Sequence, residues 1–205
     1  MDIPSFVSKY HSDFVSLISK FEATDAAGSP IPFDHAIAQC VELCKTLQSN
    51  GKKVMMIGNG GSAGITSHMA IDFWKNGKMK ATAFNDASLL TCLSNDYSYE
   101  EVFVKPIEMF GDTGDILLAI SSSGSSPNIV KASDAATAIG VQVITFSGFS
   151  ADNKLRSRGT INFYVPAFSY GYVEVLHNFI IHEMLDAKLY CQDKIDIFQK
   201  NTPIT

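Results

Sequence analysis

The sequence has no long apolar run, no block of basic residues and no N-terminal stretch with the composition of a secretion signal. Because no segment approaches the roughly 20 apolar residues of a membrane-spanning helix, we expect no membrane span. The opening MDIPSFVSKYHSDF lacks the basic and apolar regions of a signal peptide, so we expect a cytoplasmic protein. Lys and Arg number 16 against 21 Asp and Glu, a formal net charge of -5, which argues against a nucleic-acid-binding protein.

Cysteine is scarce, and no CxxC motif occurs among its four positions. This argues against a cysteine-rich zinc site or a dithiol redox centre. Cys40 and Cys44 lie one turn apart on a predicted helix among apolar residues, and we interpret them as buried core thiols rather than metal or redox ligands. The cysteine pattern therefore indicates a reducing compartment.

What the sequence does have is the composition of an ordinary globular protein, with 205 residues of which 46% are hydrophobic. This length predicts one domain with a helical appendage. Apolar residues at helical spacing predict two helices within residues 1–50, which we assign to assembly with other subunits. Residues 51–205 are predicted to form the main domain.

Within that domain, short apolar segments alternate with helical ones, as in a parallel sheet covered on both faces. We predict an α/β three-layer sandwich, a five-stranded parallel sheet flanked by helices, with the N-terminal helical pair added. In such sheets, ligands bind at the edge where the strands end. The predicted strands are 54–57, 81–84, 116–120, 141–146 and 161–165, and the predicted helices are 63–74, 99–110, 128–139 and 171–189.

Two of these strands run into loops suited to an anion. The first loop, GNGGS at 58–62, lies between a strand and a helix, where glycines allow close backbone approach and free N–H groups favour negative charge. The second, SSSGSSP at 121–127, adds hydroxyl groups, with Ser126 as the expected helix cap. Together they predict a phosphorylated small molecule, which an acidic protein can then bind without cationic side chains.

A dinucleotide site is the alternative for the first loop, because Gly58, Gly60 and Ala63 satisfy G-x-G-x-x-A. That motif also needs an acidic residue about 20 positions later, and Asp86 lies further on than expected. A dinucleotide fold also leaves the serine-rich loop unexplained. We therefore expect no nucleotide cofactor.

Candidate acid–base groups lie on two helices. His68 and Asp72 are four residues apart and so share one helix face, and the final helix carries Glu174, His177 and His182 among apolar residues. Taken singly, each pair is more often a helix-surface contact than a site. Together, imidazole and carboxylate groups suit proton abstraction next to a carbonyl through an enediolate, and they are also the ligands of a zinc-type ion.

These motifs resemble the SIS (sugar isomerase) domain superfamily and, within it, the sedoheptulose-7-phosphate (phosphoheptose) isomerases. The likeness extends from about residue 33 to 189. It rests on GNGGS at 58–62, His68 and Asp72, SND at 94–96, ISSSGSS at 120–126, VITFSG at 143–148 and His182.

The resemblance implies an aldose–ketose isomerase that makes heptose precursors for bacterial surface polysaccharide. It implies a homotetramer with active sites shared between subunits, Asp72 and His182 as the acid–base pair, and a zinc ion near His68, Asp72, Glu174 and His182. The substrate-binding residues that it implies are Asn59, Gly60, Gly61, Asn95, Asp96, Ser121, Ser122, Ser123, Ser126 and Glu174.

The sequence departs from the family's usual pattern at several positions. Family members usually have Glu in place of Asp72, Gln in place of Glu174 and Asp in place of Gly171, and the stretch 75–82 is shorter here and lacks a family arginine near Asn76. A second hypothesis is a non-catalytic sugar-phosphate sensor or a regulator that binds a replication initiator. Such relatives lack the histidine corresponding to His182, so its presence favours the enzyme.

Overall fold

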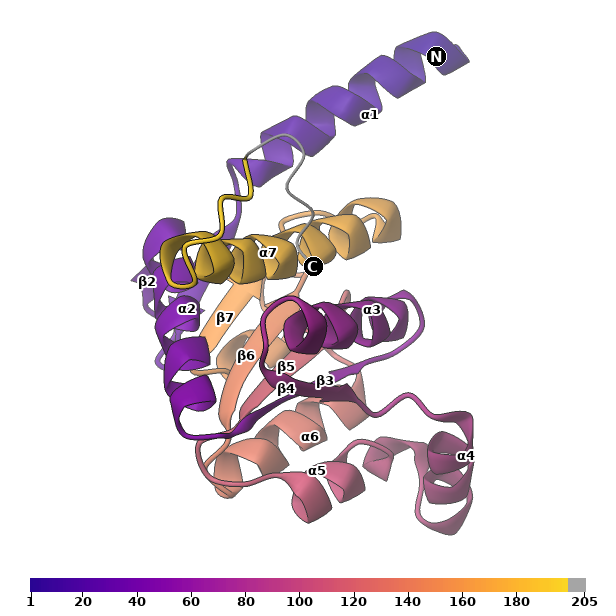
Figure 1. Ribbon diagram of the computed structural model, residues 1–205. Helices are drawn as coiled ribbons and strands as arrows, with labels where there is room; N and C mark the ends of the chain where they lie inside the picture. Colours follow the sequence, from indigo (N-terminus) through magenta and orange to yellow (C-terminus); the bar gives the residue numbers. More distant parts are fainter. Residues whose placement is uncertain (199–205) are drawn as a thin grey trace.

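The protein is organised around one sheet, seen in a computed structural model that describes residues 1–198 (Figure 1). Over those residues the sheet has seven strands in the order β2-β1-β7-β6-β5-β3-β4. The strands are β1 (Glu22–Asp25), β2 (Pro30–Ile31), β3 (Lys53–Gly58), β4 (Lys80–Ala83), β5 (Ile116–Ser121), β6 (Gln142–Ser147) and β7 (Ile161–Tyr164).

The run β7-β6-β5-β3-β4 is parallel throughout, which confirms the predicted five-stranded parallel sheet. The antiparallel strands β1 and β2 extend it at one edge and were not predicted. They are four and two residues long, too short for alternation to be recognised. Asp25 closes their turn, because its carboxylate accepts the N–H groups of Ala27 and Ser29. The domain boundary at residue 50 remains a prediction, although these strands join the common sheet.

Helices cover both faces of the sheet, so the predicted three layers are confirmed (Figure 1). Val54 and Met56 of β3 point to the face covered by α2, α3 and α7, whereas Met55 and Ile57 point to the face covered by α5 and α6. The helices are α1 (Ile3–Ile18), α2 (Phe33–Ser49), α3 (Gly61–Lys75), α4 (Ala87–Asp96), α5 (Val104–Phe110), α6 (Pro127–Ala138) and α7 (Tyr170–Cys191).

Helix α1 extends away from the sheet (Figure 1) and has no buried residue. Phe6 is 55% exposed and Val15 is 68% exposed. Apolar side chains at helical spacing with nothing covering them are typical of a helix that packs on another subunit. Within residues 1–198, no helix combines the length and apolar character needed to cross a membrane.

Helix α4 is a second element that the sequence did not predict. It begins at Ala87, directly after Asp86, whose carboxylate accepts the N–H of Leu89 at 3.0 Å and so caps the helix. Asp86, considered above as the acidic residue of a dinucleotide motif, therefore has a structural partner. The predicted helix 99–110 is divided into a 3-10 turn (Tyr99–Glu101) and α5, and Pro106 lies in the first turn of α5, where proline is tolerated.

The core cysteines are as predicted. Cys40 and Cys44 are buried on α2, and burial raises the pKa of the Cys44 thiol to about 12. At neutral pH this side chain is therefore a protonated, apolar group in the packing of α2 rather than a thiolate ligand.

Candidate active site

The first loop turns sharply between β3 and α3. Gly60 has φ of +54°, a conformation that glycine adopts without strain, and it stands at the N-terminus of α3. Asn59 beside it is fixed by three hydrogen bonds: two are exchanged with Asn128 at the start of α6, and a third is donated by the Tyr99 hydroxyl. The loop is therefore held in place before any ligand arrives.

The second loop connects β5 to α6. The hydroxyl groups of Ser121 and Ser126 lie 3.3 Å apart, and Ser123 accepts the N–H of Ser125. Ser126 caps α6 by position, but its side chain makes no capping hydrogen bond, so its hydroxyl stays available. Gly124 has φ of +60°, which allows the tight turn in the middle of the loop.

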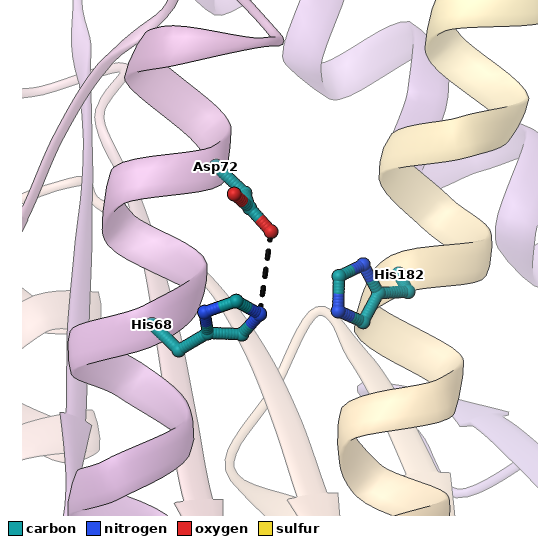
Figure 2. Close-up of side chains that lie close together, drawn as sticks. All are labelled: His68, Asp72 and His182. Atoms are coloured by element: carbon teal, nitrogen blue, oxygen red, sulfur yellow. Dashed lines mark ion pairs between the residues drawn. The ribbon is translucent and has the colours of Figure 1, made fainter. Parts of the chain in front are cut away.

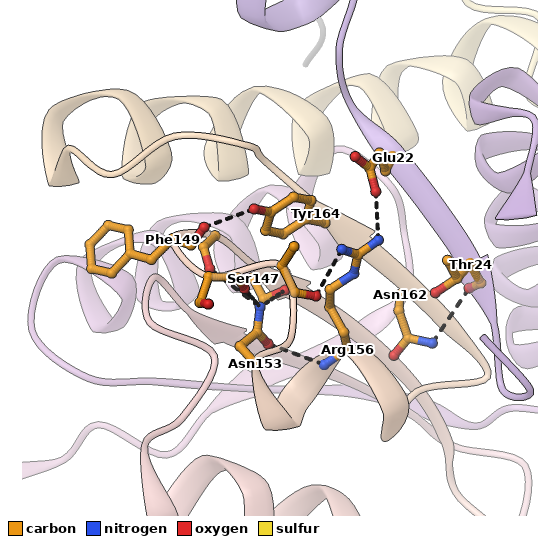
Figure 3. Close-up of polar contacts among 11 residues, drawn as sticks. Glu22, Thr24, Ser147, Phe149, Asn153, Arg156, Asn162 and Tyr164 are labelled. Atoms are coloured by element: carbon orange, nitrogen blue, oxygen red, sulfur yellow. Dashed lines mark hydrogen bonds and ion pairs between the residues drawn. The ribbon is translucent and has the colours of Figure 1, made fainter. Parts of the chain in front are cut away.

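Asn153, whose polar contacts Figure 3 shows, packs against the second loop. Its side chain packs against Gly124, where any Cβ atom would collide with it. The amide nitrogen donates to Ser147 Oγ at 3.2 Å and to the Ser150 carbonyl at 2.8 Å, and the oxygen accepts the N–H of Arg156. These hydrogen bonds hold the Asn153 side chain in place, and its contact with Gly124 in turn restricts the backbone of the second loop.

The same region is tied to the sheet edge, as Figure 3 shows. Arg156 pairs with Glu22 of β1 at 2.6 Å and stacks over the ring of Tyr164, 4.2 Å from its centroid. The Tyr164 hydroxyl donates to the Phe149 carbonyl at 2.7 Å. Strand β1, although unpredicted, therefore helps to position the segment behind the second loop.

The two loops and the start of α7 enclose a pocket of about 240 Å³. The hydroxyl of Ser122 is buried there without a hydrogen-bond partner among the described residues, which is rare in folded proteins unless a ligand or water supplies one. Ser62, from the predicted first loop, lines the pocket, as does Tyr170, which was not predicted. The lining residues are Asn59, Gly60, Gly61, Ser62, Ile120, Ser121, Ser122, Ser123, Ser126, Tyr170 and Glu174.

Glu174 lies against Gly61 in this pocket. A Cβ atom added to Gly61 would overlap the Glu174 carboxyl group, so only glycine leaves room for it. No Lys or Arg side chain is among the described lining residues. An anion bound here would therefore depend on backbone N–H groups, hydroxyls and the N-terminal ends of α3 and α6.

A second group of functional side chains lies further along α3 and α7. His68 and Asp72 of α3 face His182 of α7, as Figure 2 shows. His68 Nε2 lies 3.4 Å from Asp72 Oδ2, and the rings of His68 and His182 are 5.5 Å apart between centroids. The fold thus brings Asp72 and His182, which were predicted to act as an acid–base pair, close together across two helices.

This group also fits a divalent metal ion. One ligand atom from each of His68, Asp72 and His182 lies within 4.8 Å of the others. Two imidazoles and one carboxylate are a donor set that zinc takes in catalytic sites. Glu174, predicted as a fourth ligand, is not in this group. It precedes His182 by eight residues, about 12 Å along the helix.

Asn95 and Asp96 lie apart from both groups. They end α4, are exposed, and hydrogen-bond to each other at 2.9 Å from Asn95 Nδ2 to Asp96 Oδ1. Among the described residues they do not line the pocket formed by the two loops. Their role in substrate binding stays a prediction.

His177, the remaining histidine of α7 considered above, has a structural environment. It is fully buried, and burial lowers its pKa to about 4. Its Nε2 lies 3.0 Å from the Ser147 carbonyl, which can only accept a hydrogen bond, so the ring is neutral with its proton on Nε2. His177 therefore links α7 to the end of β6.

Comparison with known proteins shows similarity to the SIS domain and to phosphoheptose isomerases. A family model described as the SIS domain matches residues 9–148. A phosphoheptose isomerase from Shewanella denitrificans is 33% identical over 190 residues, covering 87% of this chain and 94% of that protein. One from Coxiella burnetii is 38% identical over 164 residues, covering 75% and 82%.

Solved structures of phosphoheptose isomerases also superpose on this chain. The phosphoheptose isomerase from Neisseria gonorrhoeae superposes with a TM-score of 0.79 at 28% identity, covering 95% of this chain and all of that one. The enzyme from Francisella tularensis gives the same TM-score at 26% identity, covering 92% and 98%. In each case the likeness extends over more than nine-tenths of this chain.

Proposed function

Because the chain belongs to the SIS-domain family and is a phosphosugar isomerase, we propose that it interconverts sedoheptulose 7-phosphate and D-glycero-D-manno-heptose 7-phosphate. The relatives that this chain matches over most of its length and of theirs are named phosphoheptose isomerases, and this supports the proposed substrate. The protein would act in the cytoplasm and supply heptose for bacterial surface polysaccharide.

One observation carries the proposal: the phosphate-type pocket and the ionisable group lie on the same two helices. Gly61 and His68 are both on α3, and Glu174 and His182 are both on α7. A phosphosugar with its phosphate between the loops would extend along these helices towards Asp72 and His182. Its carbonyl end would then meet the acid–base groups.

The chemistry that we assign there is a proton transfer between neighbouring carbons. From the ketose, a base removes a proton from carbon 1 and the carbon 2 carbonyl becomes an enediolate. A proton is then delivered to carbon 2, and the proton of the carbon 1 hydroxyl passes to the oxygen on carbon 2, which leaves an aldehyde at carbon 1 and a hydroxyl at carbon 2. Asp72 and His182, on facing helices, supply the base and the acid.

A metal ion is a proposed addition to this site. His68, Asp72 and His182 would hold it, and a bound divalent ion supplies a Lewis acid that polarises the sugar carbonyl. Zinc suits the donor set. The residues themselves orient the substrate and move the protons.

We assign the exposed face of α1 to subunit assembly, as a homotetramer with active sites shared between subunits. The exposed apolar side chains of α1, such as Phe6 and Val15, support this role, since a partner subunit would cover them. Light scattering coupled to gel filtration tests it: a monomer at micromolar concentration would contradict it.

The function itself is tested by measuring turnover of C5, C6 and C7 ketose phosphates with the purified protein. We expect activity with sedoheptulose 7-phosphate above that with the shorter sugars. Activity on none of them would contradict the isomerase. Thermal stabilisation by a sugar phosphate without any turnover would instead support a sensor.

A further inference from the structure

Tyr170, the first residue of α7, stands at the pocket formed by the two loops. It lines that pocket together with Ser121 and Glu174, and it is 62% exposed. A tyrosine hydroxyl can donate a hydrogen bond, and donors are what an anion needs in a pocket whose described lining contains no Lys or Arg. Tyr170 therefore has the chemistry of a ligand contact.

The ring of Tyr170 is held by Phe149, which lies two residues after the end of β6. The two rings meet edge to face, with their centroids 5.0 Å apart. Phe149 is half-buried and also stacks on Phe168, at 6.3 Å between centroids. An edge-to-face pair favours one orientation of a side chain that would otherwise rotate freely in solvent.

Phe149 has a backbone conformation that is unusual for its residue type. Its φ is +56°, in the left-handed region that glycine adopts without strain and phenylalanine does not. Two hydrogen bonds hold it there: its N–H donates to the Ala167 carbonyl at 3.0 Å, and its carbonyl accepts the Tyr164 hydroxyl (Figure 3). Strained residues of this kind cluster at functional sites, where the surrounding structure keeps them in place. The pocket residue that Phe149 contacts is Tyr170.

We infer that Tyr170 is a further substrate-binding residue, whose hydroxyl donates a hydrogen bond to the phosphate of the phosphosugar, and that Phe149 is the positioning residue that directs its ring to the pocket. The inference rests on the proposed function, because it takes this pocket as the phosphate site. The other donors there are serine hydroxyls, the Asn59 amide and backbone N–H groups. Without a cationic side chain in the lining, each neutral donor contributes a larger share of the binding.

Binding of inorganic phosphate, measured by calorimetry, and the kinetics with sedoheptulose 7-phosphate test the inference together. Tyr170→Phe removes only the hydroxyl group. We expect it to weaken phosphate binding and to raise KM about tenfold, the effect of losing one hydrogen bond to a charged group. We expect kcat to stay near the wild-type value, because the acid–base groups lie further along α3 and α7.

The matched control is Tyr172→Phe, the same substitution two residues later on α7. The Tyr172 hydroxyl donates to the Tyr10 carbonyl of α1 at 3.4 Å, and Tyr172 is not among the described residues that line the pocket. Its loss should leave phosphate binding and KM as in the wild type. Circular dichroism and the melting temperature check that each variant is folded.

Phe149→Gly tests the positioning role, because glycine keeps the left-handed backbone and removes the ring. We expect a higher KM in the wild-type background and no further rise when the substitution is combined with Tyr170→Phe. Such a coupling would mean that Phe149 acts through the Tyr170 hydroxyl. A merely structural role would add the same loss in both backgrounds and would overturn the positioning assignment.

Two results would overturn the phosphate contact: Tyr170→Phe with wild-type phosphate affinity and KM, or equal losses in Tyr170→Phe and Tyr172→Phe. If either came with normal turnover of the sugar phosphate, the proposed function would still hold. A protein that binds inorganic phosphate through Tyr170 but isomerises no sugar phosphate would contradict the proposed function and support the phosphate contact. A wild-type protein with neither turnover nor phosphate binding at millimolar concentration would overturn both.

Discussion

The side-chain amides of Asn59 and Asn128 exchange two hydrogen bonds, of 2.9 and 3.0 Å, although the residues are 69 positions apart. Asn59 belongs to the first anion-type loop and Asn128 to the helix that follows the second. The pair therefore fixes the separation of the two loops. In a pocket of about 240 Å³, that separation decides which anion fits.

We predict that Asn128→Ala raises KM for the phosphosugar about tenfold while kcat changes little. The substitution leaves the half-buried amide of Asn59 with fewer partners, a cost of about 1 kcal/mol, and frees the first loop to move. Steady-state kinetics separate the two constants. Lys131→Ala on the same helix, which removes only surface ion pairs with Glu100 and Glu101, is the control and should leave both constants as in the wild type.

A second prediction concerns the acid–base pair. Asp72→Asn and His182→Ala should each lower kcat by about 10²–10⁴-fold, the usual contribution of a positioned proton-transfer group. Circular dichroism should show an unchanged fold, because Asp72 and His182 are only partly buried. His35→Ala, at an exposed position on α2, is the control. Full turnover by either site variant would show that the assigned roles are wrong.

The sequence indicates the candidate site residues more readily than the residues that hold them in place. The two loops are visible because glycine and serine runs follow apolar strands, and His68 and Asp72 because their spacing matches a helix turn. The partner of Asn59 is not visible, since nothing local links it to a residue 69 positions away. Asn153 is hidden for the same reason, because its importance comes from packing against Gly124.

The missed elements also have physical reasons. Strands β1 and β2 are short and pair at a sheet edge, so their tertiary partners, rather than their own pattern, hold them extended. Asn162 of β7 contributes, since its amide donates to the carbonyls of Thr24 and Asp25 (Figure 3). Helix α4 has no fully buried residue, and its apolar stripe is only Leu89, Leu90 and Leu93, too short a repeat to define a helical period.

Glycine substitutions give a third prediction. Gly124→Ala should lower the free energy of unfolding by about 1–2 kcal/mol, because alanine is strained at φ of +60°. The new Cβ atom also displaces Asn153, so KM for the phosphosugar should rise. Chemical denaturation and kinetics measure the two effects.

Gly64→Ala is the matched control for that substitution. Gly64 lies within α3, has an ordinary helical φ, and has no atom within 4 Å of an added Cβ. Alanine is the better helix former there by about 1 kcal/mol, so this variant should be more stable than the wild type. If Gly124→Ala were equally stabilising, the second loop would not need its left-handed turn.

The last prediction is a loss of stability in mild acid caused by His177. In the folded protein its pKa is lowered to about 4 by burial, whereas an unfolded histidine titrates near 6.5. Between these values the unfolded chain binds a proton that the folded protein does not, so stability rises with pH across this window. The stabilisation is complete above pH 6.5 and is lost as the pH falls towards 4. The full effect, from the difference of the two pKa values, is about 3 kcal/mol.

Urea unfolding at a series of pH values measures this slope, and His177→Gln removes the titrating group while keeping a donor for the Ser147 carbonyl. The variant should be less stable at neutral pH but should lose less stability between pH 6.5 and 4 than the wild type. The exposed His35, replaced in the same way, should leave the slope unchanged. An identical slope in His177→Gln and the wild type would mean that other groups cause the acid sensitivity, and that the link from α7 to β6 does not depend on a neutral imidazole.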